Sequence, residues 1–174
     1  MTILIKNGRL INPSENLDKV MDIFVEDGII KEKAESIEKQ ADTVIDAAGC
    51  YVMPGLIDLH VHFRDPGLTY KEDIETGSKA AAKGGFTTVC CMPNTKPVVD
   101  NVETVKYIIE KGGKTGLTNV LPVGAVTKNM AGVEITDVEE LKKAGICAIS
   151  EDGKSVMNSG VYRKAMKNAA KANV

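Results

Sequence analysis

The rhythm of apolar and polar positions changes near residue 54, and this change predicts a chain of two parts. Residues 1–53 contain short runs that alternate or are wholly apolar, broken by turn residues such as Asn7-Gly8 and Asp27-Gly28. Such runs are typical of strands, and Asp-Gly between apolar runs is a strong hairpin signal. The charged stretch 31–40 fits either a short helix or a loop. We therefore predict a small N-terminal β segment over residues 1–53.

From residue 54 to 174, strand-like runs alternate with helical patterns, and the alternation occurs four times. The predicted strands are 55–62, 86–92, 118–126 and 146–150, and the predicted helices are 69–85, 100–113, 136–145 and roughly 161–173. Repeated strand–helix units indicate parallel strands joined by right-handed crossovers. Two α/β architectures fit: an open doubly wound sheet, or a (β/α)8 barrel. A whole barrel needs about 250 residues, so these units would form its first half.

Three helix starts carry capping signals. Thr69 with Glu72, and Thr136 with Glu139, match the capping-box pattern, and Asp100 is placed to cap the second helix. These residues are our predicted N-caps.

Charge and cysteine content narrow the function classes. The 22 basic and 24 acidic residues give a net charge of −2, which does not favour a nucleic-acid or anionic-membrane partner. No apolar run approaches the ~18 residues of a membrane span, and the N-terminus lacks the pattern of a signal peptide. The 4 cysteines form no CxxC pair. We therefore expect reduced thiols in a cytoplasmic protein, and not metal ligands.

Both histidines of the chain lie in one short stretch, DLHVHFRDPG, at residues 58–67. Alternate residues of a strand share a face, so His60 and His62 would point the same way and could ligate one divalent metal. Two unrelated histidines, one buried and one exposed, are the alternative. The carboxyl ends of parallel strands meet at the edge where active sites form, which also brings Asp152 into range. An aspartate there could instead cap a helix or form a turn.

Two further residues would complete a pocket for an acidic substrate. Arg64 offers a planar fork for a carboxylate, although a surface ion pair with Asp65 or Asp73 is the commoner fate of an arginine. Asn94 could donate an amide hydrogen bond to the same substrate group. By itself, it reads more simply as a turn residue.

The strings DLHVHFRDPG and KEDIETGSKAAAKGGFTTVCCMPNTKPVVD resemble dihydroorotases of the longer bacterial type, within the cyclic amidohydrolase superfamily. The resemblance runs essentially from residue 1 to 174. It implies that residues 1–53 form part of a composite β-sandwich, and that residues 54–174 form the first four β/α units of an amidohydrolase barrel. Hydantoinases share the two histidines but generally lack an arginine two residues later.

The resemblance also implies roles for individual residues. His60, His62 and Asp152 would bind one or two Zn²⁺ ions, with Asp152 matching a carboxylate that bridges two metals. Arg64 and Asn94 would bind the carboxylate of dihydroorotate or N-carbamoyl-aspartate. The activity implied is the reversible, zinc-dependent hydrolysis of the cyclic amide of dihydroorotate, in pyrimidine biosynthesis. A homo-oligomer, with aspartate transcarbamoylase as an associated partner, would be the expected assembly.

The chain departs from the family pattern in one respect. The family uses two more histidines and an aspartate that serves as ligand and general acid/base, all on later strands, whereas this chain has only 2 histidines. We therefore expect that aspartate beyond Val174, and expect the isolated 174-residue chain to be inactive. The alternatives are another cyclic amidohydrolase, such as an allantoinase or hydantoinase, and a non-catalytic assembly subunit. A metal-free binding module is a weaker alternative.

Overall fold

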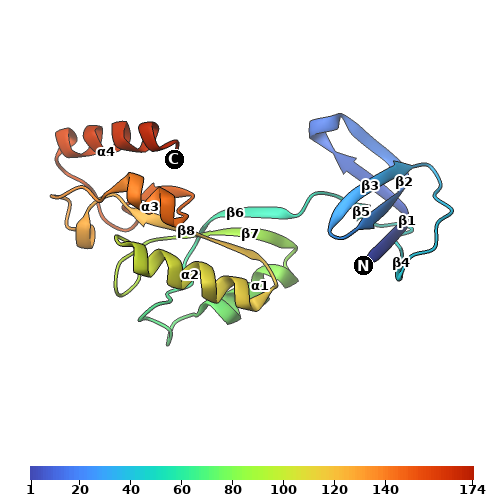
Figure 1. Cartoon of the computed structure of the whole chain (residues 1–174), viewed down its shortest axis with the longest axis horizontal. Coiled ribbons are helices and arrows are strands. Elements are labelled where there is room, and N and C mark those ends of the chain that lie inside the picture. The colour runs from blue at the N-terminus through green and yellow to red at the C-terminus, as the bar shows by residue number, and fades with distance from the viewer. The chain divides into compact units, whose positions relative to one another are not determined.

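The computed structural model describes all residues from 1 to 174 (Figure 1). The chain divides into two compact units, Met1–Pro54 and Gly55–Val174.

The first unit is a single β-sheet. Its strands are β1 (Thr2–Asn12), β2 (Leu17–Glu26), β3 (Ile29–Ala34), β4 (Thr43–Asp46) and β5 (Tyr51–Val52), with the 3-10 turn η1 (Pro13–Glu15) between β1 and β2. The sheet order is β3-β2-β1-β4, and β5 also pairs with β1. The charged stretch 31–40 is thus strand up to Ala34 and loop after it. No second sheet faces this one, so the composite sandwich stays a prediction.

The predicted hairpin is confirmed at Asp27-Gly28. These residues join β2 to β3 with φ angles of 50° and 77°. Positive φ at both central residues is what a tight two-residue hairpin turn requires. Leu4, Phe24 and Ile37 form the small core of this unit.

The second unit contains four strand–helix pairs. The elements are β6 (Leu56–Val61), α1 (Ile74–Lys83), β7 (Phe86–Cys91), α2 (Val102–Thr115), β8 (Asn119–Ala125), the 3-10 turn η2 (Lys128–Met130), α3 (Val138–Ala144), β9 (Ala148–Ser150) and α4 (Ser159–Ala172). All neighbouring strands are parallel, and the order β6-β7-β8-β9 follows the chain without reversal. A doubly wound sheet reverses its strand order, so the barrel-type α/β prediction is supported and the open alternative is not.

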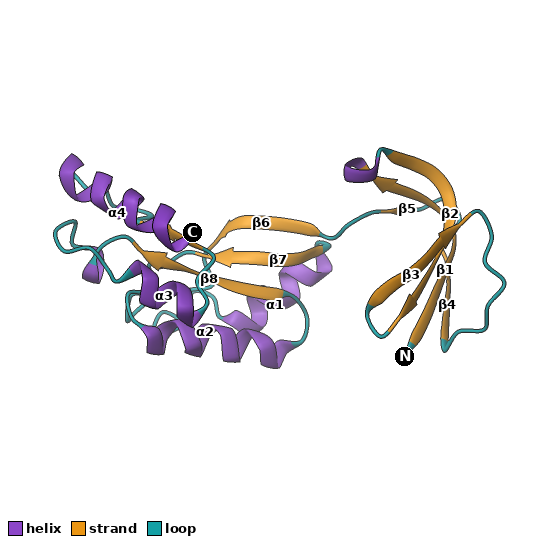
Figure 2. Cartoon of the chain, turned by 45° about the horizontal axis from the view of Figure 1, so that its top comes forward, coloured by secondary structure: helices purple, strands orange, loops and turns teal.

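Helices α1, α2 and α3 cover one side of this sheet (Figure 2). The main core lies between them and the strands, because the apolar faces of both have no other place to be buried. Its members include Ile74, Val89, Val105, Ile108 and Leu141, each at most 1% exposed. A smaller cluster around Cys90, Met92 and Val123 forms separately.

The three predicted helix caps are each wrong by one to four residues. Asp73 caps α1 through a hydrogen bond from the amide of Thr76, so Thr69 and Glu72 lie outside the helix. Asn101 caps α2 by accepting from the amide of Thr104.

Asp137, and not Thr136, caps α3 by accepting from the amide of Glu140. The reason is that neighbouring polar residues are occupied elsewhere. Asp100 accepts from the amide of Asn129, and the buried hydroxyl of Thr136 donates to the carbonyl of Ala125. A capping side chain must be free to turn toward the first helical turn, and only tertiary contacts decide which candidate is free.

All four cysteines are free thiols; Cys90 and Cys91 are buried, Cys147 is partly buried and Cys50 is exposed. No helix in the structure has both the length and the apolar character needed to cross a membrane.

Candidate metal centre and anion pocket

The two histidines lie at the carboxyl end of β6. His60 is within the strand, and His62 follows its last residue, Val61. Their rings approach edge to face, with centroids 5.2 Å apart. Asp58, on the same strand, does not join them, because its carboxylate accepts a hydrogen bond from the backbone amide of His60 at 3.0 Å.

Asp152 reaches both imidazoles from the loop that follows β9. Its Oδ1 lies 3.1 Å from His60 Nε2, and its Oδ2 lies 3.4 Å from His62 Nε2. The three donor atoms lie within 4.8 Å of one another. Because β6 and β9 are the first and last strands of the sheet, this cluster joins residues about 90 positions apart at one end of the sheet.

Asn94, from the loop after β7, links His62 to Asp152. Its Nδ2 donates to Asp152 Oδ2 at 2.9 Å, which leaves its Oδ1 facing His62 Nδ1 at 3.1 Å. An amide oxygen accepts only, so His62 Nδ1 is the donor in this bond. In the neutral ring of that tautomer, the lone pair of Nε2 faces the Asp152 carboxylate, so these two acceptors can share one metal cation.

The cluster is open to solvent on one side. The side chain of His60 is 56% exposed, that of His62 30% and that of Asp152 21%. His60 also lines a cavity of about 530 Å³, together with apolar residues and the thiols of Cys90 and Cys147. In this chain the donor atoms are therefore accessible to solvent.

Arg64 has no ion pair or side-chain hydrogen bond. The two acids that the sequence offered as ion-pair partners of Arg64 have other contacts. Asp65 pairs with Lys111 at 2.6 Å, and Asp73 caps α1. The backbone of Arg64 has a φ of 58°, so the strand does not stay extended to this residue. The half-buried guanidinium thus remains available to an anion.

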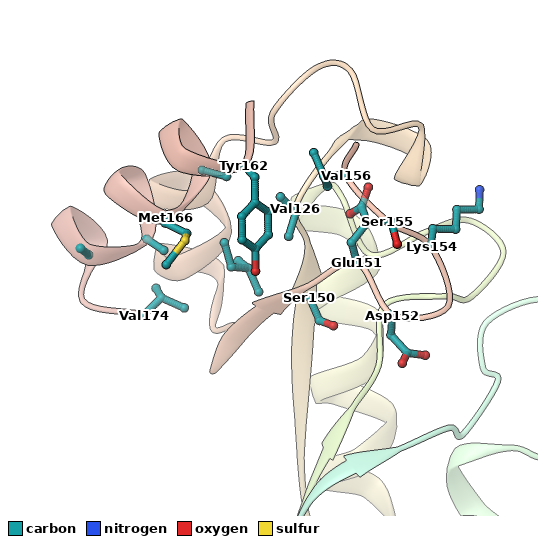
Figure 3. A pocket seen from close by; sticks show the side chains of 14 residues that line it. Val126, Ser150, Glu151, Asp152, Lys154, Ser155, Val156, Tyr162, Met166 and Val174 are labelled. Atoms are coloured by element: carbon teal, nitrogen blue, oxygen red, sulfur yellow. The ribbon is translucent and has the colours of Figure 1, made fainter. Parts of the chain in front are cut away.

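The other acid at the end of β9, Glu151, is engaged elsewhere. The buried Glu151 carboxylate accepts from the amide of Thr127 at 3.1 Å and from its hydroxyl. A pocket of about 680 Å³ lies beside α4, and Asp152 lines it together with Tyr162 and Met166; in Figure 3 the Asp152 carboxylate points away from those two side chains. Of the acids at this strand end, Asp152 alone joins the histidines.

One arrangement near the site was not predicted. Tyr107 and Lys111 of α2 both contact the buried carboxylate of Asp65. More than 40 positions separate these residues from Asp65, and a tyrosine and a lysine four apart on a helix are commonplace in sequence. No signal in the sequence could have paired them.

Comparisons with known proteins agree with this geometry. The family model described as dihydro-orotase-like matches residues 49–174. Dihydroorotases of Pelobacter propionicus and Aquifex aeolicus are 49% and 50% identical to this chain over 97% and 100% of its length. The match covers 40% and 41% of those two proteins, so the chain spans about two fifths of their length.

Solved structures of hydantoinases have folds similar to that of this chain. An L-hydantoinase from Arthrobacter aurescens covers 98% of this chain with a TM-score of 0.80 at 24% identity, and the match spans 38% of the hydantoinase. A D-hydantoinase from a Thermus species covers 97% with a TM-score of 0.72 at 30% identity, again over 38% of that protein. The family model matches most of the chain, and the chain belongs to the dihydroorotase-like family.

Proposed function

We propose that the protein containing this chain is a dihydroorotase, which interconverts dihydroorotate and N-carbamoyl-aspartate by hydrolysing and closing the cyclic amide. The observation that carries the proposal is the cluster of His60, His62 and Asp152 within 4.8 Å, with Arg64 uncommitted nearby in sequence. Dihydroorotases about 50% identical over the whole chain support it. The reaction belongs to pyrimidine biosynthesis.

The donor set fits zinc. Imidazole nitrogens and carboxylate oxygens are its usual ligands, and the lone pair of His62 Nε2 opposite Asp152 favours a cation there. His60, His62 and Asp152 would hold the metal, with one or two ions per site. A zinc ion at such a site lowers the pKa of water and polarises a carbonyl oxygen.

The protein's own groups would orient the substrate and its ligands. Arg64 would bind the ring carboxylate of dihydroorotate through a charge-assisted bond. Asn94, which contacts His62 and Asp152, would orient both ligands. The Asn94 amide contacts both proposed ligands, and we propose that it also hydrogen-bonds the substrate carboxylate.

The same family membership supports the wider assembly. We propose that residues 1–53 belong to a composite β-sandwich and residues 54–174 to the first four units of a barrel. We also propose a cytoplasmic homo-oligomer that associates with aspartate transcarbamoylase.

The proposal is tested by zinc content and dihydroorotate hydrolysis, measured on this chain and on the product of the reading frame that contains it. Asp152→Asn removes a charged donor, while Asp137→Asn is the matched control, because asparagine caps a helix as well as aspartate does. We expect zinc and hydrolysis in the longer product, loss of both with Asp152→Asn, and retention with Asp137→Asn.

Two results would contradict the proposal. If the longer product folds but contains no zinc, the proposed metal centre is wrong. If the longer product hydrolyses hydantoin or allantoin but not dihydroorotate, it is another cyclic amidohydrolase, a hydantoinase or an allantoinase. Those substrates lack the ring carboxylate that Arg64 would bind.

A further inference from the structure

The residue after Arg64 carries a fully buried carboxylate with three partners. The side chain of Asp65 is 0% exposed. Its Oδ2 lies 2.6 Å from Lys111 Nζ and 3.3 Å from the amide of Ile74, which donates to it. Its Oδ1 accepts from the Tyr107 hydroxyl at 2.9 Å. The loop after β6 is thereby tied to α2 and to the first residue of α1.

Each partner contributes to keeping this charge buried. A carboxylate removed from water is strongly disfavoured unless a cation and hydrogen-bond donors replace the lost solvent. Lys111 supplies the cation, and its Nζ also lies 3.3 Å from the Tyr107 hydroxyl, so the three side chains form a closed triangle. The hydrogen bond to Asp65 raises the pKa of Lys111, which keeps the ammonium charged.

The loop has a second attachment on its other side. The amide of Lys96 donates to the carbonyl of Pro66 at 3.0 Å, and the amide of Leu68 donates to the carbonyl of Arg64 at 2.9 Å. A Cβ on Gly67 would lie 1.8 Å from the Lys96 carbonyl oxygen, so the two loops are in direct backbone contact. Asn94 belongs to the same loop as Lys96. The attachments of this turn therefore act on both proposed substrate-binding residues.

Arg64 depends on these attachments because nothing holds its own side chain. Its left-handed backbone, at φ 58°, is uncommon for a residue with a Cβ and persists only where the surroundings enforce it. Both of its neighbours are anchored: Phe63 belongs to the main core, and Asp65 is held by its buried ion pair and hydrogen bonds.

We propose that Asp65, Tyr107 and Lys111 form a positioning clamp that fixes the turn carrying Arg64, which follows the carboxyl end of β6. The role rests on the proposed function, in which Arg64 binds the substrate carboxylate. None of the three clamp residues is proposed to touch substrate.

The test compares Lys111→Met and Tyr107→Phe with Lys106→Met, a matched control on the same helix whose lysine has no ion pair. Two readouts are taken on the reading-frame product: hydrogen exchange at the amides of Leu68 and Lys96, and KM against kcat for dihydroorotate. In both clamp variants we expect exchange at these amides to rise about tenfold, because a charge-assisted or buried bond is lost. We expect KM to rise several-fold and kcat to change less, while Lys111→Arg restores both readouts toward the wild type.

Different results would contradict the clamp and the proposed role of Arg64. Unchanged exchange in folded Lys111→Met would overturn the clamp, whatever the kinetics. A second result would also overturn the clamp: the clamp variants exchange faster but keep the wild-type KM, although Arg64→Met raises KM. The loop would then move without displacing Arg64. An unchanged KM in Arg64→Met itself would instead refute the role proposed for Arg64.

Discussion

Arg64 is the residue on which substrate choice depends in the proposed function. Replacing it by methionine keeps much of the side-chain length and removes the fork that would bind a carboxylate. A hydrogen bond to a charged group contributes about 1.5–3 kcal/mol, which corresponds to roughly 10- to 150-fold in affinity. We expect Arg64→Met to raise KM for dihydroorotate by about that factor, with a smaller change in kcat.

Steady-state kinetics on the reading-frame product measures this effect. Arg163→Met is the matched control, since Arg163 lies on α4 and is exposed without an ion pair. Equal KM values for the two variants would show that Arg64 does not bind the substrate carboxylate.

Asp22 is a second residue with a testable charge, this time in the first unit. Burial of this carboxyl disfavours its charged form, yet the amides of Asn7 and Ile37 and the nearby Lys6 outweigh that effect and lower the pKa of Asp22. A lowered pKa stabilises the folded state above the unfolded value of about 3.9, and this stability is lost as the pH falls through the folded pKa.

We therefore expect Asp22→Asn to destabilise the first unit at pH 7 by about 1–3 kcal/mol, because the amide NH₂ cannot accept a bond. The difference from wild type should shrink below pH 4 as the wild-type carboxyl takes up its proton. Urea unfolding followed between pH 7 and 3 measures this difference, and a gap that does not depend on pH would contradict the assignment.

At the scale of elements, helix α2 contains two adjacent glycines in opposite surroundings. A Cβ on Gly112 would lie 2.6 Å from Val120 Cβ on β8, whereas a Cβ on Gly113 would meet no atom within 4 Å. Alanine stabilises a helix interior by roughly 0.5–1 kcal/mol relative to glycine where space allows. We expect Gly113→Ala to stabilise the second unit by that amount, and Gly112→Ala to destabilise it by about 1–3 kcal/mol through overpacking.

Chemical denaturation of the two variants tests this prediction, and each serves as the control for the other. Equal effects of the two substitutions would mean that α2 does not approach β8 as closely as the structure shows. The pair also measures helix packing on the sheet without altering any proposed site residue.

At the scale of the whole molecule, the proposed metal ligands all lie in the unit Gly55–Val174, and each unit has its own core. A ligand that binds only the folded state stabilises it by mass action. Added zinc should therefore slow hydrogen exchange at core amides of the second unit, such as Val89 and Val123, and leave Leu4 and Phe24 of the first unit unchanged.

Exchange measured with and without zinc checks this expectation, with His60→Ala as the variant that should abolish the protection. Equal protection of both units would indicate binding outside the proposed site. Protection that persists in His60→Ala would have the same meaning.

Much of the second unit follows from local pattern. The four strand–helix repeats predicted the parallel strands, because strand and helix periods are read over a few residues, and the crossover rule then leaves few topologies. His60 and His62 could be paired from their spacing alone, since alternate strand residues share a face. Asp152 could be added because parallel strands end at one edge of the sheet. The helix caps were misplaced because several polar residues compete for each helix start.

What the sequence by itself determined was therefore the fold class, the hairpin at Asp27-Gly28 and the set of donors at the strand ends, all of which depend on short-range periodicity. Only the tertiary structure decided that Arg64 is unpaired, that Asn94 contacts His62 and Asp152, and that Asp65 is held by Tyr107 and Lys111. These contacts join residues 32 to 58 positions apart. Their partners are chosen by packing between elements, which no local pattern encodes.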